Sequence, residues 1–332
     1  MRLSESPLFL IDKEFIEIKD KGNYGDLYIL NLIDNFKIPL PEELPPFKLS
    51  GKNSNPNDAD ILIYGDSFFD GKARGKQLPE KLYDTLKKKV FFNDRISRYL
   101  LDLEKQNYSS KRKKIFLLEI AQYNIPKVFS NLQPLEEKKP SKLDEYRIIF
   151  PIGYEKKYLY LLQHSILTYK MHTTIVNFMF DYLGCIPPIT PVYIKDPPWL
   201  FENQDLDETT KISFYYKYSN EELQNICNNI EDLSEKLYEK YNLKLVFLPI
   251  PNKYTFYHKL LNNDTYNNFI PALCNELKKR NIGVIEIYEE FLKSDKILYY
   301  PTDTHYNQDG DNIVLKKILE YLNSNTDLLK QF

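Results

Sequence analysis

Short apolar runs alternate with amphipathic helical segments along most of this chain, and this alternation constrains the fold more than any other feature. The first run, DADILIYGD at residues 58–66, is an apolar stretch bounded by Asp and Gly, which is typical of a buried strand in a parallel sheet. Further apolar runs lie at residues 90–92, 114–122, 243–251 and 283–288, and helical patterns lie at 78–89, 95–106, 219–241, 265–280 and 309–323. Because parallel strands are joined by crossover helices, the pattern predicts an α/β fold with a central, mostly parallel sheet and right-handed connections.

Two regions depart from this alternation. Residues 1–54 contain the loop-like stretches IPLPEELPPF and SGKNSNPND, so we interpret them as an N-terminal extension of a domain that spans 55–325. Residues 135–218 contain a long aromatic helical stretch at about 156–183, followed by a predicted strand pair that includes KISFYYKY. We interpret 135–218 as an insertion, or as a lobe beside the sheet.

The start of one helix can be read directly from the residues. Ser219 and Glu222 have the spacing of a capping box, in which the hydroxyl and the carboxylate each satisfy a free backbone amide. The sequence therefore predicts a helix that begins at Ser219 and runs to about Tyr241.

Charge and cysteine content exclude several classes of protein. The chain of 332 residues has 45 Lys and Arg against 47 Asp and Glu, so we expect neither a nucleic-acid partner nor an anionic membrane surface as a partner. The basic run at 111–114 is interpreted as a solvated loop. The three cysteines are widely spaced and form neither a CxxC metal pattern nor a disulfide framework. No apolar run has the roughly 18 residues of a membrane span, and the N-terminus lacks a signal-peptide pattern, so we expect the chain as given to be soluble, while a leader removed earlier stays compatible with the sequence.

The Gly65-Asp66-Ser67 tripeptide follows the first predicted strand. In a parallel sheet, the loop after the carboxyl end of a strand presents its side chains to the ligand crevice. Gly65 allows a tight turn there, and Ser67 would offer an exposed oxygen together with nearby backbone amides that can hold negative charge. Alternatively, Asp66 and Ser67 only cap a helix. The tripeptide alone leaves both interpretations open.

A nucleophilic serine needs a base, and the chain has only four histidines to supply it. His164 and His172 lie in the aromatic helical stretch, where packing or surface positions are the simpler interpretation, and His258 could border a cleft. His305 differs because Asp303 is two residues before it in a loop that leads into a helix. An Asp at this spacing can orient an imidazole and stabilise its charged form, although Asp303 could also serve as a turn or helix cap.

These segments together resemble a known superfamily. GDSF near the start of an α/β domain and Asp-x-His near its end resemble the SGNH (GDSL-type) hydrolase superfamily. More narrowly, YYPTDTHYNQDG resembles the signature of the alginate O-acetyltransferase-like branch, as do PIPNKYTFYH, PPWLFEN and IFLLEIAQYNIP. The serine block precedes the Asp-x-His block here, as in ordinary SGNH esterases and unlike the branch, an order that a circular permutation would explain.

The resemblance implies a three-layer α/β/α domain and a set of site residues. It implies that Ser67 is the acyl-accepting nucleophile, that His305 is the general base and acid, and that Asp303 orients His305. It implies further oxyanion donors beside the Ser67 amide, for which Asn93, Asn124 and Gln122 are candidates. Tyr306 replaces the Trp of the branch as an aromatic platform, and Glu119 matches an acidic position of the branch, as a buried partner or as part of the crevice.

The same resemblance implies three possible functions. The first is O-acyl transfer, in which Ser67 takes an acetyl group and a carbohydrate hydroxyl accepts it. The second is a carbohydrate or lipid esterase, with water as the acceptor, and the third is a non-catalytic glycan-binding protein. Relatives work outside the cytoplasm and often receive acyl groups from a membrane-bound O-acyltransferase, so we expect an extracytoplasmic location and such a donor. We expect no cofactor and no metal, because the other histidines are not paired at ligand spacings.

Overall fold

The computed structural model describes residues 25–40, 55–70, 78–94, 99–130, 166–184, 189–192, 198–206, 210–211, 213, 216–261 and 266–325. The chain divides into two compact units. The smaller one comprises 1–43, 133–203 and 301–303, and the larger one comprises 44–132, 204–300 and 304–332. Ser67 and His305 both belong to the larger unit, so the following description concentrates on it.

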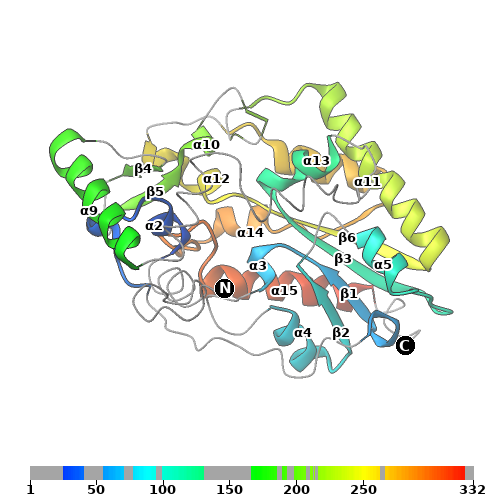
Figure 1. The fold of residues 1–332 in the computed structure, drawn as a ribbon. Coiled ribbons are helices and arrows are strands. Elements are labelled where there is room, and N and C mark those ends of the chain that lie inside the picture. Colours follow the sequence, from blue (N-terminus) through cyan, green and yellow to red (C-terminus); the bar gives the residue numbers. More distant parts are fainter. Residues whose placement is uncertain are drawn as a thin grey trace, which may run out of the picture. The chain divides into compact units, whose positions relative to one another are not determined.

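A five-stranded parallel sheet forms the centre of the larger unit (Figure 1). Its strand order is β2-β1-β3-β6-β7, with β1 at Ile61–Tyr64, β2 at Val90–Asn93, β3 at Lys114–Ala121, β6 at Leu243–Ile250 and β7 at Gly283–Val284. Each neighbouring pair of strands is parallel. This confirms the α/β fold with a parallel central sheet that the alternating pattern predicts.

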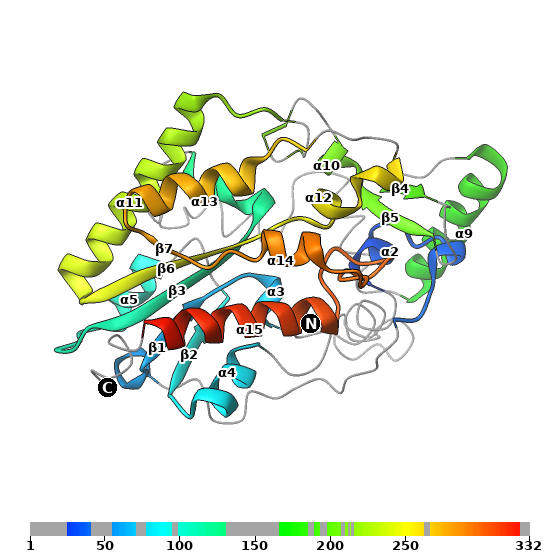
Figure 2. The ribbon, with the colours of Figure 1, turned by 180° about the vertical axis from the view of Figure 1, so that it is seen from behind.

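Helices cover both faces of this sheet. On one side lie α11 (Asn220–Tyr241) and α13 (Phe269–Lys279), and on the other lie α4 (Leu78–Leu86) and α15 (Gln308–Ser324) (Figures 1 and 2). The strands are apolar because both of their faces are buried. The strand residues Leu62, Phe116 and Leu245 belong to the same core cluster as Ile230 of α11 and Leu273 of α13.

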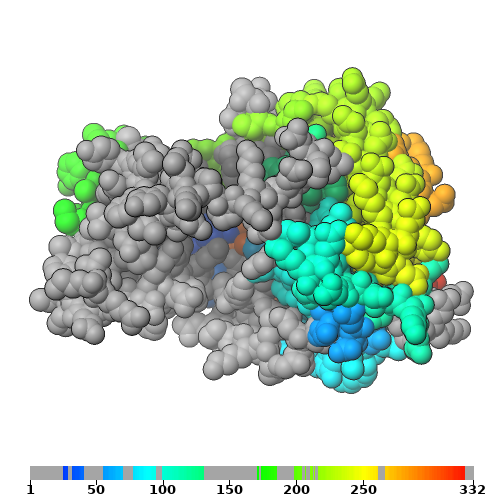
Figure 3. Space-filling model, turned by 45° about the vertical axis from the view of Figure 1, so that its right-hand side comes forward, coloured from blue at the N-terminus to red at the C-terminus, as the bar shows by residue number. Residues whose placement is uncertain are grey.

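The start of α11 confirms the predicted capping box. Ser219 Oγ accepts the backbone N–H of Glu222 at 3.2 Å, and the Glu222 carboxylate accepts the N–H of Ser219 at 3.0 Å. The helix ends at Tyr241, as predicted, because Asn242 adopts the left-handed conformation that terminates a helix. Near this end, Lys240 Nζ pairs with Glu104 Oε1 at 2.6 Å, and α11 lies beside α5 (Tyr99–Lys105) on the surface (Figure 3).

Among its described residues, the smaller unit contains two α-helices, a short 3₁₀ helix (Asp34–Phe36) and a strand pair. The α-helices are α2 (Asp26–Asn31) and α9 (Ile166–Leu183), and the antiparallel strands are β4 (Ile189–Val192) and β5 (Trp199–Glu202). Their core includes Tyr28, Phe36 and Leu200, against which Phe180 of α9 packs. No helix among the described residues combines the length and apolarity that a membrane crossing requires.

Several predicted elements differ in position or length. The strand pair after the aromatic stretch is β4 with β5, whereas the described residues of KISFYYKY (211, 213 and 216–218) are turns, bends or irregular. Alternating aromatic residues at this point reflect packing, since Tyr218 stacks on Phe269 with ring centroids 4.3 Å apart. The strand predicted at 283–288 is only the two residues of β7, and α14 (Tyr288–Lys293) begins where it was expected to end. The part of the aromatic stretch at 156–165 lies outside the described residues.

Candidate active site

Ser67 lies on an exposed turn directly after β1. Strand β1 ends at Tyr64, the N–H of Gly65 still bonds to the carbonyl of Asn93 on β2 at 3.1 Å, and Ser67 begins the short helix α3 (Ser67–Asp70). Ser67 is exposed, whereas Asp66 before it and Phe68 after it are buried at 8% exposure each. The turn therefore presents the serine hydroxyl at the carboxyl edge of the sheet, where parallel α/β sheets bind ligands.

The carboxylate of Asp66 holds this turn in shape. One oxygen, Oδ1, accepts the N–H of Phe68 at 3.1 Å. The other, Oδ2, accepts the N–H of Ala121 at the end of β3 at 2.9 Å and the side-chain amide of Asn124 at 3.3 Å. Asp66 thus caps α3, as the simpler interpretation of the tripeptide predicted, and also links the turn to the end of the neighbouring strand.

Glu119 of β3 makes the reciprocal link. It is fully buried, and its Oε2 accepts the backbone N–H of Asp66 at 2.8 Å. The backbone pairing of β1 with β3 ends at Tyr64 and Leu118, so side-chain carboxylates replace the ladder where the strands diverge. The carboxylate approaches so closely that a Cβ on Gly65 would lie 2.6 Å from Glu119 Oε2. A side chain at position 65 would therefore force the Glu119 carboxylate to move.

His305 lies against the serine. Its Nε2 is 2.7 Å from Ser67 Oγ, within hydrogen-bonding distance, although Ser67 and His305 are 238 positions apart in the chain. The imidazole is largely buried at 7% exposure and packs on the ring of Phe68, with centroids 4.5 Å apart. The other ring nitrogen of His305, Nδ1, lies 3.2 Å from Thr304 Oγ1. This geometry allows the imidazole to take the proton of the serine hydroxyl.

The loop that carries His305 is braced on both sides. Tyr299 and Tyr306 form an antiparallel β-bridge, and the carbonyl of His305 accepts the N–H of Tyr300 at 3.3 Å. Tyr306 is buried, donates its hydroxyl to the carbonyl of Phe68 at 3.3 Å, and burial holds the pKa of its phenol well above the usual value. Tyr306 therefore packs beneath the Ser67 turn.

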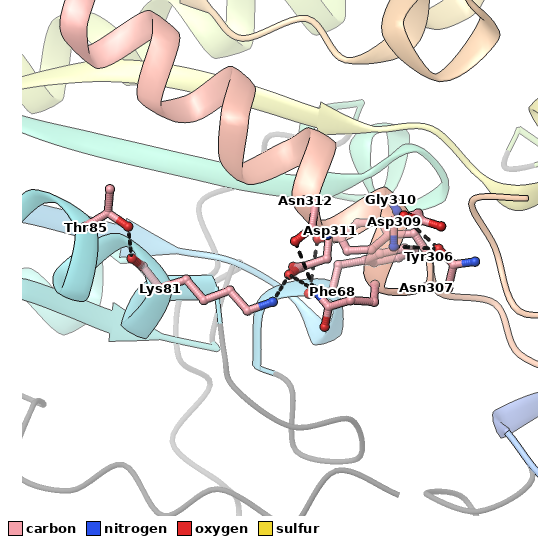
Figure 4. A network of polar contacts seen from close by, with 10 residues as sticks. Phe68, Lys81, Thr85, Tyr306, Asn307, Asp309, Gly310, Asp311 and Asn312 are labelled. Carbon is pink, nitrogen blue, oxygen red and sulfur yellow. Dashed lines mark hydrogen bonds and ion pairs between the residues drawn. The ribbon is translucent and has the colours of Figure 1, made fainter. Parts of the chain in front are cut away.

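The helix that follows this loop is fixed by polar contacts at its start. Asn307 caps α15 by accepting the N–H groups of Asp309 and Gly310 at 3.0 and 3.1 Å. One turn further, the carboxylate of Asp311 forms an ion pair with Lys81 of α4, and both side chains point toward each other in Figure 4. Burial raises the pKa of Asp311, while the adjacent Lys81 lowers it.

Asp303 lies in the smaller unit and is fully buried at 0% exposure. Its Oδ2 accepts the backbone N–H of Asp26, the first residue of α2, at 2.9 Å. No sequence pattern indicates this contact, because the predicted N-terminal extension carries no motif around Asp26. Asp303 remains two positions before His305 in the chain, the spacing on which its predicted role rests.

The predicted oxyanion candidates lie at the carboxyl end of β2 (Asn93) or follow β3 (Gln122 and Asn124), and each carboxamide is bonded to another group. Asn93 Nδ2 donates to Asp102 at 3.0 Å, and Asn124 Nδ2 donates to Asp66. Gln122 Oε1 accepts the N–H of Asn252 at 3.3 Å and the hydroxyl of Thr255 at 3.0 Å. The bond to Asp66 places Asn124 in the network that shapes the Ser67 turn. Asn93 is instead bonded to Asp102, and Gln122 is bonded to the start of α12 (Lys253–Tyr257).

The other histidines are not brought to Ser67 by any contact that the structure describes. His258 follows α12, and its Nδ1 lies 3.0 Å from the carbonyl of Thr255. His172 is on α9 in the smaller unit, and His164 lies outside the described residues.

Comparison with protein families supports the resemblance noted in the sequence. Residues 192–331 match the family model of the SGNH hydrolase-like domain of acetyltransferase AlgX. The matched segment contains Asp303 and His305, and Ser67 precedes it. No curated protein and no solved structure gives a significant match to the chain. Over residues 192–331, the chain is therefore similar to the SGNH hydrolase-like domain of acetyltransferase AlgX.

Proposed function

We propose that this protein is a serine-dependent O-acyltransferase, which moves an acetyl group to a carbohydrate hydroxyl through an acyl-Ser67 intermediate. The observation that supports the proposal most strongly is the 2.7 Å separation of His305 Nε2 and the exposed Ser67 Oγ. The AlgX-type family match supports acyl chemistry at the coarser level of an acetyltransferase or hydrolase.

In the first step, His305 Nε2 removes the proton from Ser67 Oγ as the oxygen attacks the carbonyl carbon of the acyl donor. The donor's leaving oxygen then takes that proton from His305, and the acyl group stays on Ser67. In the second step, His305 removes the proton of the acceptor hydroxyl, which attacks the acyl carbon. Ser67 Oγ departs and recovers the proton.

Asp303 in this proposal orients His305 and stabilises its imidazolium form. The backbone N–H of Ser67 is one donor to the developing oxyanion, and the carboxamides of Asn93, Asn124 and Gln122 are the candidates for the others. The donor would be an acyl group supplied by a membrane-bound O-acyltransferase outside the cytoplasm, as the family resemblance implies.

A fluorophosphonate probe tests the nucleophile. We expect the probe to label the unaltered protein on Ser67, Ser67→Ala to lose the label, and His305→Ala to react at least about 10³-fold more slowly, in line with losses seen when a member of such a triad is removed. Lack of labelling in the folded, unaltered protein would favour a non-catalytic glycan-binding role instead.

A second assay separates transferase from esterase. The protein is incubated with p-nitrophenyl acetate, with and without an oligosaccharide, and products are analysed by mass spectrometry. A transferase yields acetylated oligosaccharide that disappears in Ser67→Ala. Release of acetate alone, whatever the acceptor, would establish the esterase alternative, because the same residues then use water as the acceptor.

A further inference from the structure

The segment around Gly25 and Asp26 lies far from Asp303 in the sequence but contacts its carboxylate directly. The N–H of Asp26 donates to Asp303 Oδ2 at 2.9 Å across 277 positions. Because Asp303 is fully buried, its charged form needs hydrogen-bond donors to replace water. The Asp26 amide is at the first position of α2, where a backbone N–H has no partner within its own helix.

Gly25 makes this approach possible. It has a φ of +90°, in the region that L side chains rarely adopt. A Cβ at this position would also lie 2.3 Å from the carbonyl oxygen of Thr302 and 2.9 Å from Cβ of Asp303. Both the backbone conformation and the space therefore require glycine, and they do so at the residue next to the amide that bonds to Asp303.

We propose that Gly25 and Asp26 form a positioning element for the Asp303 carboxylate, with the Asp26 amide as the donor that fixes one carboxylate oxygen. The inference rests on the proposed function, since it assigns a task to a residue that would orient His305. The proposal concerns the backbone amide of Asp26. Its carboxylate lies within 4.8 Å of that of Asp303, so the test has to separate the amide from the side chain.

One substitution removes the amide together with the Asp26 side chain, and a second removes the side-chain carboxylate alone. Asp26→Pro deletes the N–H, and proline suits the first position of a helix. The ψ of Gly25 is 160°, which a residue before proline adopts readily. Asp26→Ala is the matched variant that keeps the N–H and removes the carboxylate. Asn220→Pro, at the exposed first position of α11, controls for adding a proline at a helix start.

We expect Asp26→Pro to lower both kcat for p-nitrophenyl acetate and the rate of fluorophosphonate labelling by about 10- to 100-fold, which corresponds to losing a hydrogen bond to a charged group. KM should stay the same, because the proposal gives the Asp26 amide the task of holding Asp303 and not of binding substrate. Asn220→Pro should keep rates within about 3-fold of the unaltered protein, and Asp26→Ala, which keeps the N–H, should lose much less than Asp26→Pro. Gly25→Ala should resemble Asp26→Pro.

Equal labelling rates in folded Asp26→Pro and the unaltered protein would overturn the inference, as would a loss in Asp26→Ala as large as in Asp26→Pro. No labelling of the unaltered protein would overturn the proposed function, and the inference with it. If proline prevents folding, as judged by circular dichroism, hydrogen exchange in the Asp303→Ala variant decides. The Asp26 amide should exchange faster there than in the unaltered protein, and an unchanged rate would overturn the inference.

Discussion

The carboxylate of Glu119 accepts the backbone amide of Asp66 at 2.8 Å, so a side chain of β3 holds the turn that presents Ser67. Asp66 returns the contact by accepting the N–H of Ala121 at 2.9 Å. These two hydrogen bonds between carboxylates and backbone amides replace the backbone pairing with β3 that β1 loses after Tyr64. The turn that carries Ser67 is thus joined to β3 by a hydrogen bond in each direction.

Glu119→Leu should destabilise the fold and slow labelling of Ser67. The variant leaves the buried N–H of Asp66 without its acceptor, which costs about 1–3 kcal/mol in the free energy of unfolding. Glu119→Gln keeps an acceptor oxygen and should lose less than half as much. Urea unfolding and the fluorophosphonate labelling rate provide the two measurements. A Leu variant as stable and as reactive as the unaltered protein would show that Glu119 does not hold the turn.

Gly65→Ala should be destabilising mainly because of Glu119. The added methyl would lie 2.6 Å from Glu119 Oε2, and overpacking of this kind costs about 1–3 kcal/mol. In a Glu119→Ala background the oxygen is gone, so the same substitution should cost at least about 0.5 kcal/mol less. A double-mutant cycle from urea unfolding measures this difference. Additive costs would locate the requirement for glycine in the contacts with Phe69 and Phe92 instead.

Asp311 should make stability fall as the pH rises through the acidic range. Burial raises its pKa in the folded state above the ordinary 3.8, so between 3.8 and that raised pKa the folded protein binds more protons than the unfolded chain. Stability from this group is therefore greatest below 3.8 and declines above it. Asp311→Asn should remove that decline. The test compares urea unfolding of the two proteins between pH 3.5 and 7, at roughly half-unit steps, and parallel curves would contradict it.

Glu222 should have the opposite effect. Its pKa is lowered from 4.5 to about 2 by the ion pair with Lys211, by the Ser219 amide and by the Tyr216 hydroxyl. The stability that it contributes is fully present above 4.5 and is lost as the pH falls toward about 2. Glu222→Gln should therefore be less stable than the unaltered protein near neutral pH, with a difference that shrinks at low pH. A difference that does not change with pH would contradict the assignment.

The order of strands and helices could be predicted from the sequence because burial of an element produces a local pattern of apolar residues. Residues 61–64 are apolar throughout since β1 is covered on both faces, and Ser219 with Glu222 marks a helix start within four positions. The Gly65-Asp66-Ser67 turn could likewise be placed after a strand. Each of these inferences uses neighbours in the chain, where spacing alone determines which groups can meet.

The lengths of strands and the hydrogen-bond partners of amide side chains were less predictable from the sequence. Strand β7 has only two residues although GVIEIY has the composition of a longer strand. Its last residue pair with β6 is Phe247 with Val284, and the N–H of Ile285 still donates to the carbonyl of Phe247 at 2.9 Å. Asn93, Asn124 and Gln122 were equivalent candidates in the sequence, and their bonds to Asp102, Asp66 and Thr255 distinguish them. An amide side chain can bond to whatever the fold brings near it, so composition does not select its partner.

The sequence by itself determined the class of fold, the exposed serine turn and the spacing of Asp303 and His305. Only the tertiary structure decided that His305 Nε2 lies 2.7 Å from Ser67 Oγ, that Glu119 supports the turn, and that the amide of Asp26 reaches Asp303. The physical reason is separation along the chain. Local patterns encode which face of an element is buried, whereas a hydrogen bond between residues 53, 238 or 277 positions apart depends on how whole elements pack.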